Sequence, residues 1–212
     1  MIARKNIPNL LTVLRLFLAG GLFALLAFYR FDTGVAWLLI PAIVMFIAAA
    51  VTDALDGYLA RKWEVVSKFG RIMDPFCDKV LVLGAVVFLA GPGFVDAHGS
   101  GALVSGVYPW MVVLVISREL LVTGIRGEME STGHNFGANV WGKLKMVLQS
   151  VVVPVVLLIV LLFEADPRRF GWLAWVRDVL VYATVLVTLL SGLPYITGAM
   201  KIARADGGSA ED

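Results

Sequence analysis

The sequence predicts an all-α, polytopic integral membrane protein with six transmembrane helices. Of its 212 residues, 59% are hydrophobic, against roughly 45–50% in soluble globular domains. Six apolar runs approach or exceed the roughly 20 residues that cross a bilayer as a helix. Because lipid offers no hydrogen-bond partners, the backbone within such runs is expected to be helical.

The six runs follow one another along the chain, and several carry polar residues at one end. The first follows Pro8 and has no small-residue cleavage site after it, so we interpret it as a retained helix and not as a signal peptide. The second and third flank an acidic stretch, and the fourth and fifth carry basic residues on the same side of the membrane. Pro154 and Pro194 predict kinks in the fifth and sixth runs. The expected spans are residues 9–29, 35–60, 70–90, 108–126, 144–163 and 172–201.

The chain is expected to form one domain. It contains no Pro/Ser-rich linker, no low-complexity block and no internal repeat, and its single cysteine, Cys77, excludes an intrachain disulfide framework. We therefore expect one membrane-embedded domain over residues 1–205, followed by a disordered polar tail over residues 206–212.

Basic residues are distributed unequally between the two sides of the expected bundle. With six spans both termini lie on one side, which receives fourteen of the 18 Lys and Arg residues. The other side receives Arg30, Arg168, Arg169 and Arg177. The positive-inside rule then makes the side with both termini cytoplasmic. Nucleic acid is not an expected partner, because the basic residues flank membrane helices and form no separate basic domain.

Four aspartates lie within one stretch that covers the end of the second expected span and the start of the third. The spacings of three and four residues put each pair on one face of a helix. Charged side chains in membrane helices are costly and usually functional. A single pair at a helix end would be interpreted as a solvated cap, but the small residues between the two pairs argue against simple capping. The stretch reads Asp53-x-x-Asp56-Gly57-x-x-Ala60-Arg61, eight further residues, and Gly70-x-x-x-Asp74-x-x-x-Asp78.

Carboxylate oxygens at these positions favour a hard divalent cation. Mg²⁺ or Mn²⁺ fits such ligands, whereas the sequence has no Cys or His cluster for Zn²⁺. Two such ions about 4 Å apart would hold a diphosphate and stabilise both oxygens of an in-line displacement. Gly57, Ala60 and Gly70 leave room for a nucleotide close to the backbone. Arg61 is suited to pair with a phosphate or with an aspartate.

The stretch resembles the signature of the CDP-alcohol phosphatidyltransferase family without a departure. That resemblance implies a six-helix membrane enzyme, commonly a homodimer, in which an alcohol displaces CMP from a CDP-linked lipid. It also implies roles for the matching residues. The aspartates at 53, 56, 74 and 78 would hold two Mg²⁺ or Mn²⁺ ions, and Asp78 would be the general base. Gly57, Ala60, Arg61 and Gly70 would bind the CDP group.

The flanking residues resemble those of bacterial phosphatidylglycerophosphate synthases, at positions 6–15, 116–119, 124–126 and 142–145. This resemblance implies that CDP-diacylglycerol and glycerol 3-phosphate react to phosphatidylglycerophosphate and CMP. It places the protein in the inner (plasma) membrane, with active site and termini cytoplasmic. Within the same family, inositol phosphate, serine or phosphatidylglycerol are alternative acceptors.

Four basic residues at the cytoplasmic ends of the fourth and fifth spans are candidates for binding an anionic acceptor. They are Arg118, Arg126, Lys143 and Lys145. The simpler interpretations are that Arg118 neutralises Glu119 or the aspartates, and that the lysines are an ordinary cytoplasmic flank. An ion or proton transporter is the alternative from another class. It predicts ionisable residues throughout the bilayer depth and broken helices near the midplane, whereas here the charges gather at one end.

Overall fold

The computed structural model describes the backbone of residues 7–63, 68–97, 99–132 and 140–208. Within those ranges it describes the side chains except at residues 7–9, 54, 56–63, 68–72, 74, 75, 78, 143 and 203–208. The described residues form helices joined by loops, with one isolated bridge between Val95 and Leu103. The all-α prediction is therefore confirmed.

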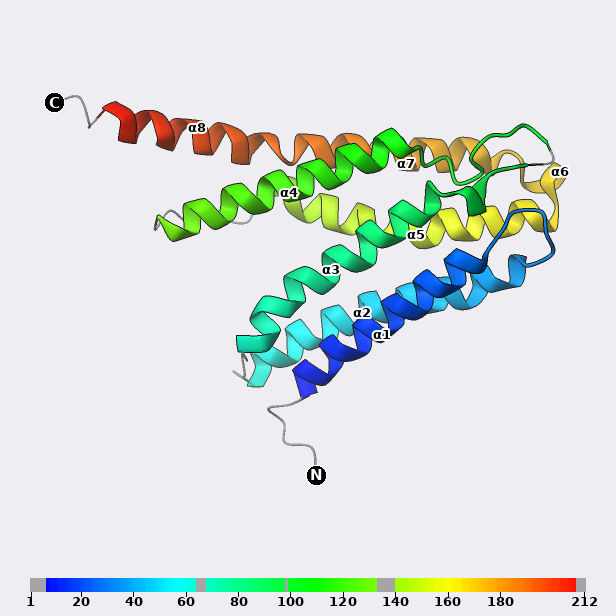
Figure 1. Ribbon diagram of the computed structural model, residues 1–212, viewed down its shortest axis with the longest axis horizontal. Coiled ribbons are helices and arrows are strands. Elements are labelled where there is room, and N and C mark those ends of the chain that lie inside the picture. The colour runs from blue at the N-terminus through cyan, green and yellow to red at the C-terminus, as the bar shows by residue number, and fades with distance from the viewer. Residues whose placement is uncertain (1–6, 64–67, 98, 133–139, 209–212) are drawn as a thin grey trace.

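Seven long helices make up an elongated bundle (Figure 1). Three shorter segments, η2 (Ala36–Leu38), η3 (Pro92–Phe94) and α6 (Pro167–Phe170), lie in the connections. The long helices are α1 (Ile7–Phe28), α2 (Leu39–Trp63), α3 (Lys68–Leu89), α4 (Pro109–Ser131), α5 (Val140–Ala165), α7 (Leu173–Leu190) and α8 (Leu193–Gly208).

The helices pack in two groups. In the first group α1 contacts α2 and α3, and in the second α4 contacts α7 and α8. The groups are joined by α5, which contacts α2, α3 and α7, and by a direct contact between α3 and α4. The core between them is apolar, and Leu22, Phe46 and Val156 are at most 1% exposed. Many apolar side chains on the outer faces are exposed, as expected for helices that face lipid.

Four segments among the described residues are long and apolar enough to cross a membrane. They are Leu10–Phe28, Ala36–Asp53, Val140–Ala165 and Leu173–Ile202. The third and fourth expected spans are not among them, so six spans are not shown. Yet α3 and α4 contain 22 and 23 residues, and a rise of about 1.5 Å per residue gives them the roughly 30 Å that a bilayer core requires. Both helices carry charged residues of the candidate site within their length.

The sixth expected span consists of two helices. α7 ends at Leu190, and α8 begins at Leu193 with Pro194 in its first turn, where a missing N–H is tolerated. α5, in contrast, continues through Pro154. α8 extends to Gly208, so the first three residues of the predicted tail belong to its last turn, and residues 209–212 lie outside the described residues.

The end of the bundle far from both termini is tied together by polar contacts. The buried Tyr29 hydroxyl donates to Glu164, which joins the end of α1 to α5. The Phe31 amide donates to the Gly93 carbonyl at 2.9 Å, and Arg177 donates to the Val104 carbonyl at 2.8 Å. At the opposite end the helix ends of the two groups separate (Figure 1). We refer to this end as the open end of the bundle.

Candidate functional site

The acidic stretch lies on α2 and α3 at the open end of the bundle. Asp53 and Asp56 lie in α2, Asp74 and Asp78 lie in α3, and the two helices contact each other. Among the four, the side chain of Asp53 is described; those of the other three lie outside the described side chains, as do those of Gly57, Ala60, Arg61 and Gly70. Within the described side chains no group of three or more potential ligands forms a metal site.

Asp53 is held by a buried arginine on α1. Arg15 Nη1 lies 2.9 Å from Asp53 Oδ1, and the side chain of Arg15 is 1% exposed while that of Asp53 is 36% exposed. A carboxylate that is fixed on one side and open on the other suits a metal ligand, since ligating carboxylates are commonly oriented by a second hydrogen bond. Arg15 was not predicted to be a site residue. Its position as a lone charge inside an apolar run was the signal that could have indicated a functional role.

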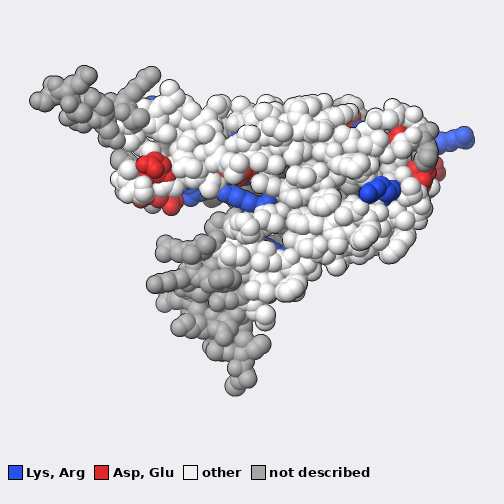
Figure 2. All heavy atoms as spheres, in the orientation of Figure 1, with Lys and Arg blue, Asp and Glu red and all other residues white. Residues whose placement is uncertain are grey.

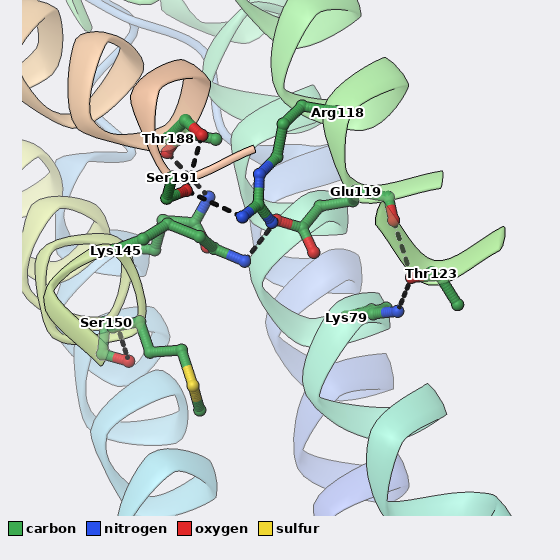
Figure 3. Close-up of polar contacts among 10 residues, drawn as sticks. Lys79, Arg118, Glu119, Thr123, Lys145, Ser150, Thr188 and Ser191 are labelled. Carbon is green, nitrogen blue, oxygen red and sulfur yellow. Dashed lines mark hydrogen bonds and ion pairs between the residues drawn. The ribbon is translucent and has the colours of Figure 1, made fainter. Parts of the chain in front are cut away.

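A second polar group, here termed the cation cluster, consists of Arg118 and Glu119 of α4, Lys145 of α5 and Ser191 after α7 (Figure 3). Arg118 Nη1 donates to Glu119 Oε1 at 2.9 Å, and Arg118 Nη2 donates to Ser191 Oγ at 2.7 Å. Lys145 Nζ donates to the same oxygen of Glu119. Residues separated by more than 70 positions thus meet at one point.

The cation cluster is buried and has an excess of positive charge. Arg118, Glu119 and Lys145 are 8%, 6% and 8% exposed. Among the described side chains one carboxylate faces two cations, and Arg118 Nε has no hydrogen-bond acceptor there. Charges out of water need compensation by partners of opposite sign. The cluster is therefore suited to an anion.

Polar side chains outside the cation cluster form two further sets of contacts beside it. Gln149 of α5 donates to Thr188 of α7 at 3.3 Å. Lys79 of α3 donates to Thr123 of α4, whose hydroxyl donates to the Glu119 carbonyl at 2.6 Å. Because Lys79 directly follows Asp78, this chain of contacts connects the aspartate helix to the cation cluster.

The structure separates the four predicted acceptor-binding residues. It brings Arg118 and Lys145 together, and the contact of Arg118 with Glu119 that the sequence suggested is present. Arg126 lies further along α4, where it is 51% exposed and 3.7 Å from Glu130. The side chain of Lys143 lies outside the described residues. Sequence reasoning assigned Ser191 no role and considered Glu119 only as the partner of Arg118, because no spacing connects either residue to Lys145.

One face of the molecule is hollowed beside α4, and atoms of Lys and Arg are exposed in that hollow (Figure 2). The hollow lies toward the end of the bundle at which the two groups of helices separate (Figures 1 and 2). Positive charge is therefore accessible from the surface at this end of the bundle.

Known proteins are similar to this chain over nearly its whole length. The profile of the CDP-alcohol phosphatidyltransferase family matches residues 5–190. The CDP-diacylglycerol–glycerol-3-phosphate 3-phosphatidyltransferase of Bacillus subtilis is 34% identical over 202 residues, covering 91% of this chain and 94% of that protein. The proteins of the same name from Escherichia coli K12 and Cereibacter sphaeroides are 34% and 30% identical, covering 92% of this chain and 94% and 96% of their own lengths.

Proposed function

Because the chain belongs to the CDP-alcohol phosphatidyltransferase family, we propose that it transfers a phosphatidyl group from CDP-diacylglycerol to glycerol 3-phosphate. It is a membrane transferase of phospholipid biosynthesis, and CDP-diacylglycerol and an alcohol are its substrate classes. The products of the proposed reaction are phosphatidylglycerophosphate and CMP. The names of the relatives support glycerol 3-phosphate as the acceptor.

The observation that carries the acceptor assignment is the excess positive charge of the cation cluster. Arg118 and Lys145 share the single carboxylate of Glu119, so one positive charge remains for the acceptor phosphate. Serine, which has no net charge, gains little from such a pocket. Inositol phosphate and phosphatidylglycerol are anionic and fit the same charge, so they are the acceptors that an experiment must separate from glycerol 3-phosphate.

The residues of the acidic stretch fit a divalent metal site. In the proposal Asp53, Asp56, Asp74 and Asp78 hold Mg²⁺ or Mn²⁺, because oxygen ligands suit hard cations. When bound, the metal supplies charge stabilisation to the diphosphate of the CDP group. Arg15 fixes Asp53 at 2.9 Å. Gly57, Ala60, Arg61 and Gly70 line the CDP site in the same proposal.

The proposed chemical step is a single displacement at phosphorus. Asp78 accepts the proton of the sn-1 hydroxyl of glycerol 3-phosphate. The hydroxyl oxygen forms a bond to the phosphorus that carries diacylglycerol, and the bond from that phosphorus to the CMP oxygen breaks. Arg118 and Lys145 hold the acceptor phosphate during the step, so that the hydroxyl is oriented toward the CDP substrate.

The arrangement in the membrane is part of the proposal. We place α3 and α4 across the bilayer as the third and fourth of six spans, because their lengths suffice. The distribution of basic residues puts the open end and both termini in the cytoplasm. A homodimer in the inner (plasma) membrane is the proposed assembly.

Product identification tests the proposed function. Detergent-purified protein is given CDP-diacylglycerol, Mg²⁺ and one radiolabelled acceptor at a time: glycerol 3-phosphate, inositol phosphate, serine or phosphatidylglycerol. Labelled lipid from glycerol 3-phosphate is the expected product. Labelled lipid from another acceptor alone would keep the transferase chemistry and refute the acceptor. Absence of lipid product with every acceptor would refute the function and favour a transporter.

A further inference from the structure

The junction between α7 and α8 lies directly against Arg118. α7 ends at Leu190 and α8 begins at Leu193, so Ser191 and Gly192 form the break. Ser191 is 0% exposed, and its Oγ accepts a hydrogen bond from Arg118 Nη2 at 2.7 Å. A Cβ atom added at Gly192 would lie 3.4 Å from Arg118 Cγ. The backbone of the break therefore packs closely along the arginine side chain.

The orientation of the Ser191 hydroxyl is fixed by the end of α7. Ser191 Oγ donates to the carbonyl of Thr188 at 2.6 Å, one of the last carbonyls of a helix, which lack partners within it. A hydroxyl has one proton and two lone pairs. Because the proton points to Thr188, lone pairs remain for Arg118. Ser191 thus acts toward Arg118 as an acceptor.

Ser191 holds Arg118 without reducing the charge of the cation cluster. The carboxylate of Glu119 already faces both Arg118 and Lys145. A second carboxylate at position 191 would cancel the remaining positive charge, whereas a neutral hydroxyl leaves it intact. The contact therefore orients the guanidinium and preserves the attraction for an anion.

We propose that Ser191 is a positioning residue that, through Arg118, sets the affinity of the protein for the phosphate of its acceptor. This inference rests on the proposed function, because it takes Arg118 as the group that binds the acceptor. Ser191 follows the last residue matched to the family profile, which ends at residue 190.

Steady-state kinetics of variants at position 191 test the proposal. Ser191→Ala is expected to raise KM for glycerol 3-phosphate about tenfold, the size of losing one hydrogen bond to a charged group. The kcat of this variant and its KM for CDP-diacylglycerol should each stay within about twofold of the wild-type value. Ser191→Thr, which keeps the hydroxyl, should restore KM, and Ser191→Asp should raise it further than Ser191→Ala. Ser150→Ala is the matched control, since Ser150 is exposed and donates to the Met146 carbonyl of its own helix at 2.9 Å.

Two results would overturn the proposal. One is an unchanged KM for glycerol 3-phosphate in Ser191→Ala; the other is a joint change of kcat and both KM values with a lower melting temperature, which indicates a structural role alone. If Ser191→Ala does not fold, equal KM values in Ser191→Thr and Ser191→Asp would refute the idea. Should the wild type require another anionic acceptor, the proposed function fails, and the same KM series with that acceptor decides the role of Ser191. If the wild type requires an acceptor without negative charge, both the proposed function and the proposed role of Ser191 are refuted.

Discussion

The aspartate region on α2 and α3 and the cation cluster beside α4 differ in sign and in burial. The described carboxylate of the first, Asp53, is 36% exposed and faces one buried arginine, Arg15. The second is at most 8% exposed, and two cations there face one carboxylate. The sequence places three further aspartates, Asp56, Asp74 and Asp78, in the first region, whereas the described side chains of the second carry more positive than negative charge. In the proposed function the two regions take partners of opposite sign, a cation for the aspartates and an anion for the cluster.

The two regions also differ in how the chain assembles them. The aspartates lie on two successive helices that a short connection joins. The cation cluster takes its members from α4, α5 and the α7–α8 junction, across positions 118 to 191. Lys79 of α3 contacts Thr123 of α4 and so connects the two regions. We infer that one region is a local motif and the other a product of tertiary packing.

The largest expected effect is on catalysis, in the aspartate region. Asp78→Asn should lower kcat by about 10³-fold or more, because the proposed general base is lost while shape is kept. Melting temperature should stay close to that of the wild type. Asp32→Asn is the control, as an exposed aspartate at the far end with φ 58°, a conformation that asparagine tolerates. Full activity in Asp78→Asn would refute the assignment of the base.

The next effect is on stability, in the cation cluster. Glu119→Gln should lower the free energy of unfolding by about 3 kcal/mol, because it leaves Arg118 and Lys145 buried without their shared anion. Thermal unfolding in detergent measures the loss. Glu130→Gln should change little, since Glu130 is 61% exposed. Equal melting temperatures of the two variants would contradict the burial argument.

A smaller effect is expected where the aspartate region meets α1. Arg15→Met should lower activity roughly 10- to 100-fold, with partial recovery at higher Mg²⁺ concentration, because a partner that orients a metal ligand is removed. The chain should still fold, since water reaches the half-open Asp53. Activity is measured across a Mg²⁺ series, with Arg168→Met at the far end as control. A loss of activity that higher Mg²⁺ concentration does not reduce would argue against a role of Arg15 in metal binding.

The smallest effect marks the limit of the cation cluster. Arg126→Gln should change KM for glycerol 3-phosphate by less than about twofold, because Arg126 is 51% exposed and pairs with Glu130 outside the cluster. Arg118→Gln in the same assay should raise that KM by at least tenfold. An equally large effect in both variants would extend the acceptor pocket along α4.

How well each region could be predicted follows from its assembly. The helices and the placement of the aspartates on α2 and α3 follow from hydrophobic runs and from spacings of three and four residues. The pairing of Arg118 with Glu119 was open to prediction because the two are adjacent. The contact of Arg15 with Asp53, and that of Ser191 with Arg118, depend on how distant helices pack. No periodicity in a single sequence encodes such contacts.

The boundaries of the spans show the same limit. α3 and α4 are long enough to cross a membrane, but they carry charged residues within that length. Their length therefore favours a membrane span, whereas their composition does not. The break after Leu190 was expected only as a kink at Pro194. In both cases the departure from a regular span occurs where polar side chains of the candidate site are gathered.

Release of CMP by the purified protein tests most directly whether the reaction requires both a cation for the aspartate region and an anionic acceptor for the cation cluster. CDP-diacylglycerol is supplied with Mg²⁺ or with a chelator, and each condition is run with and without glycerol 3-phosphate. The account predicts release only when Mg²⁺ and glycerol 3-phosphate are both present, because each charged region then has its partner. Release at the full rate without glycerol 3-phosphate, or in the presence of the chelator, would contradict it.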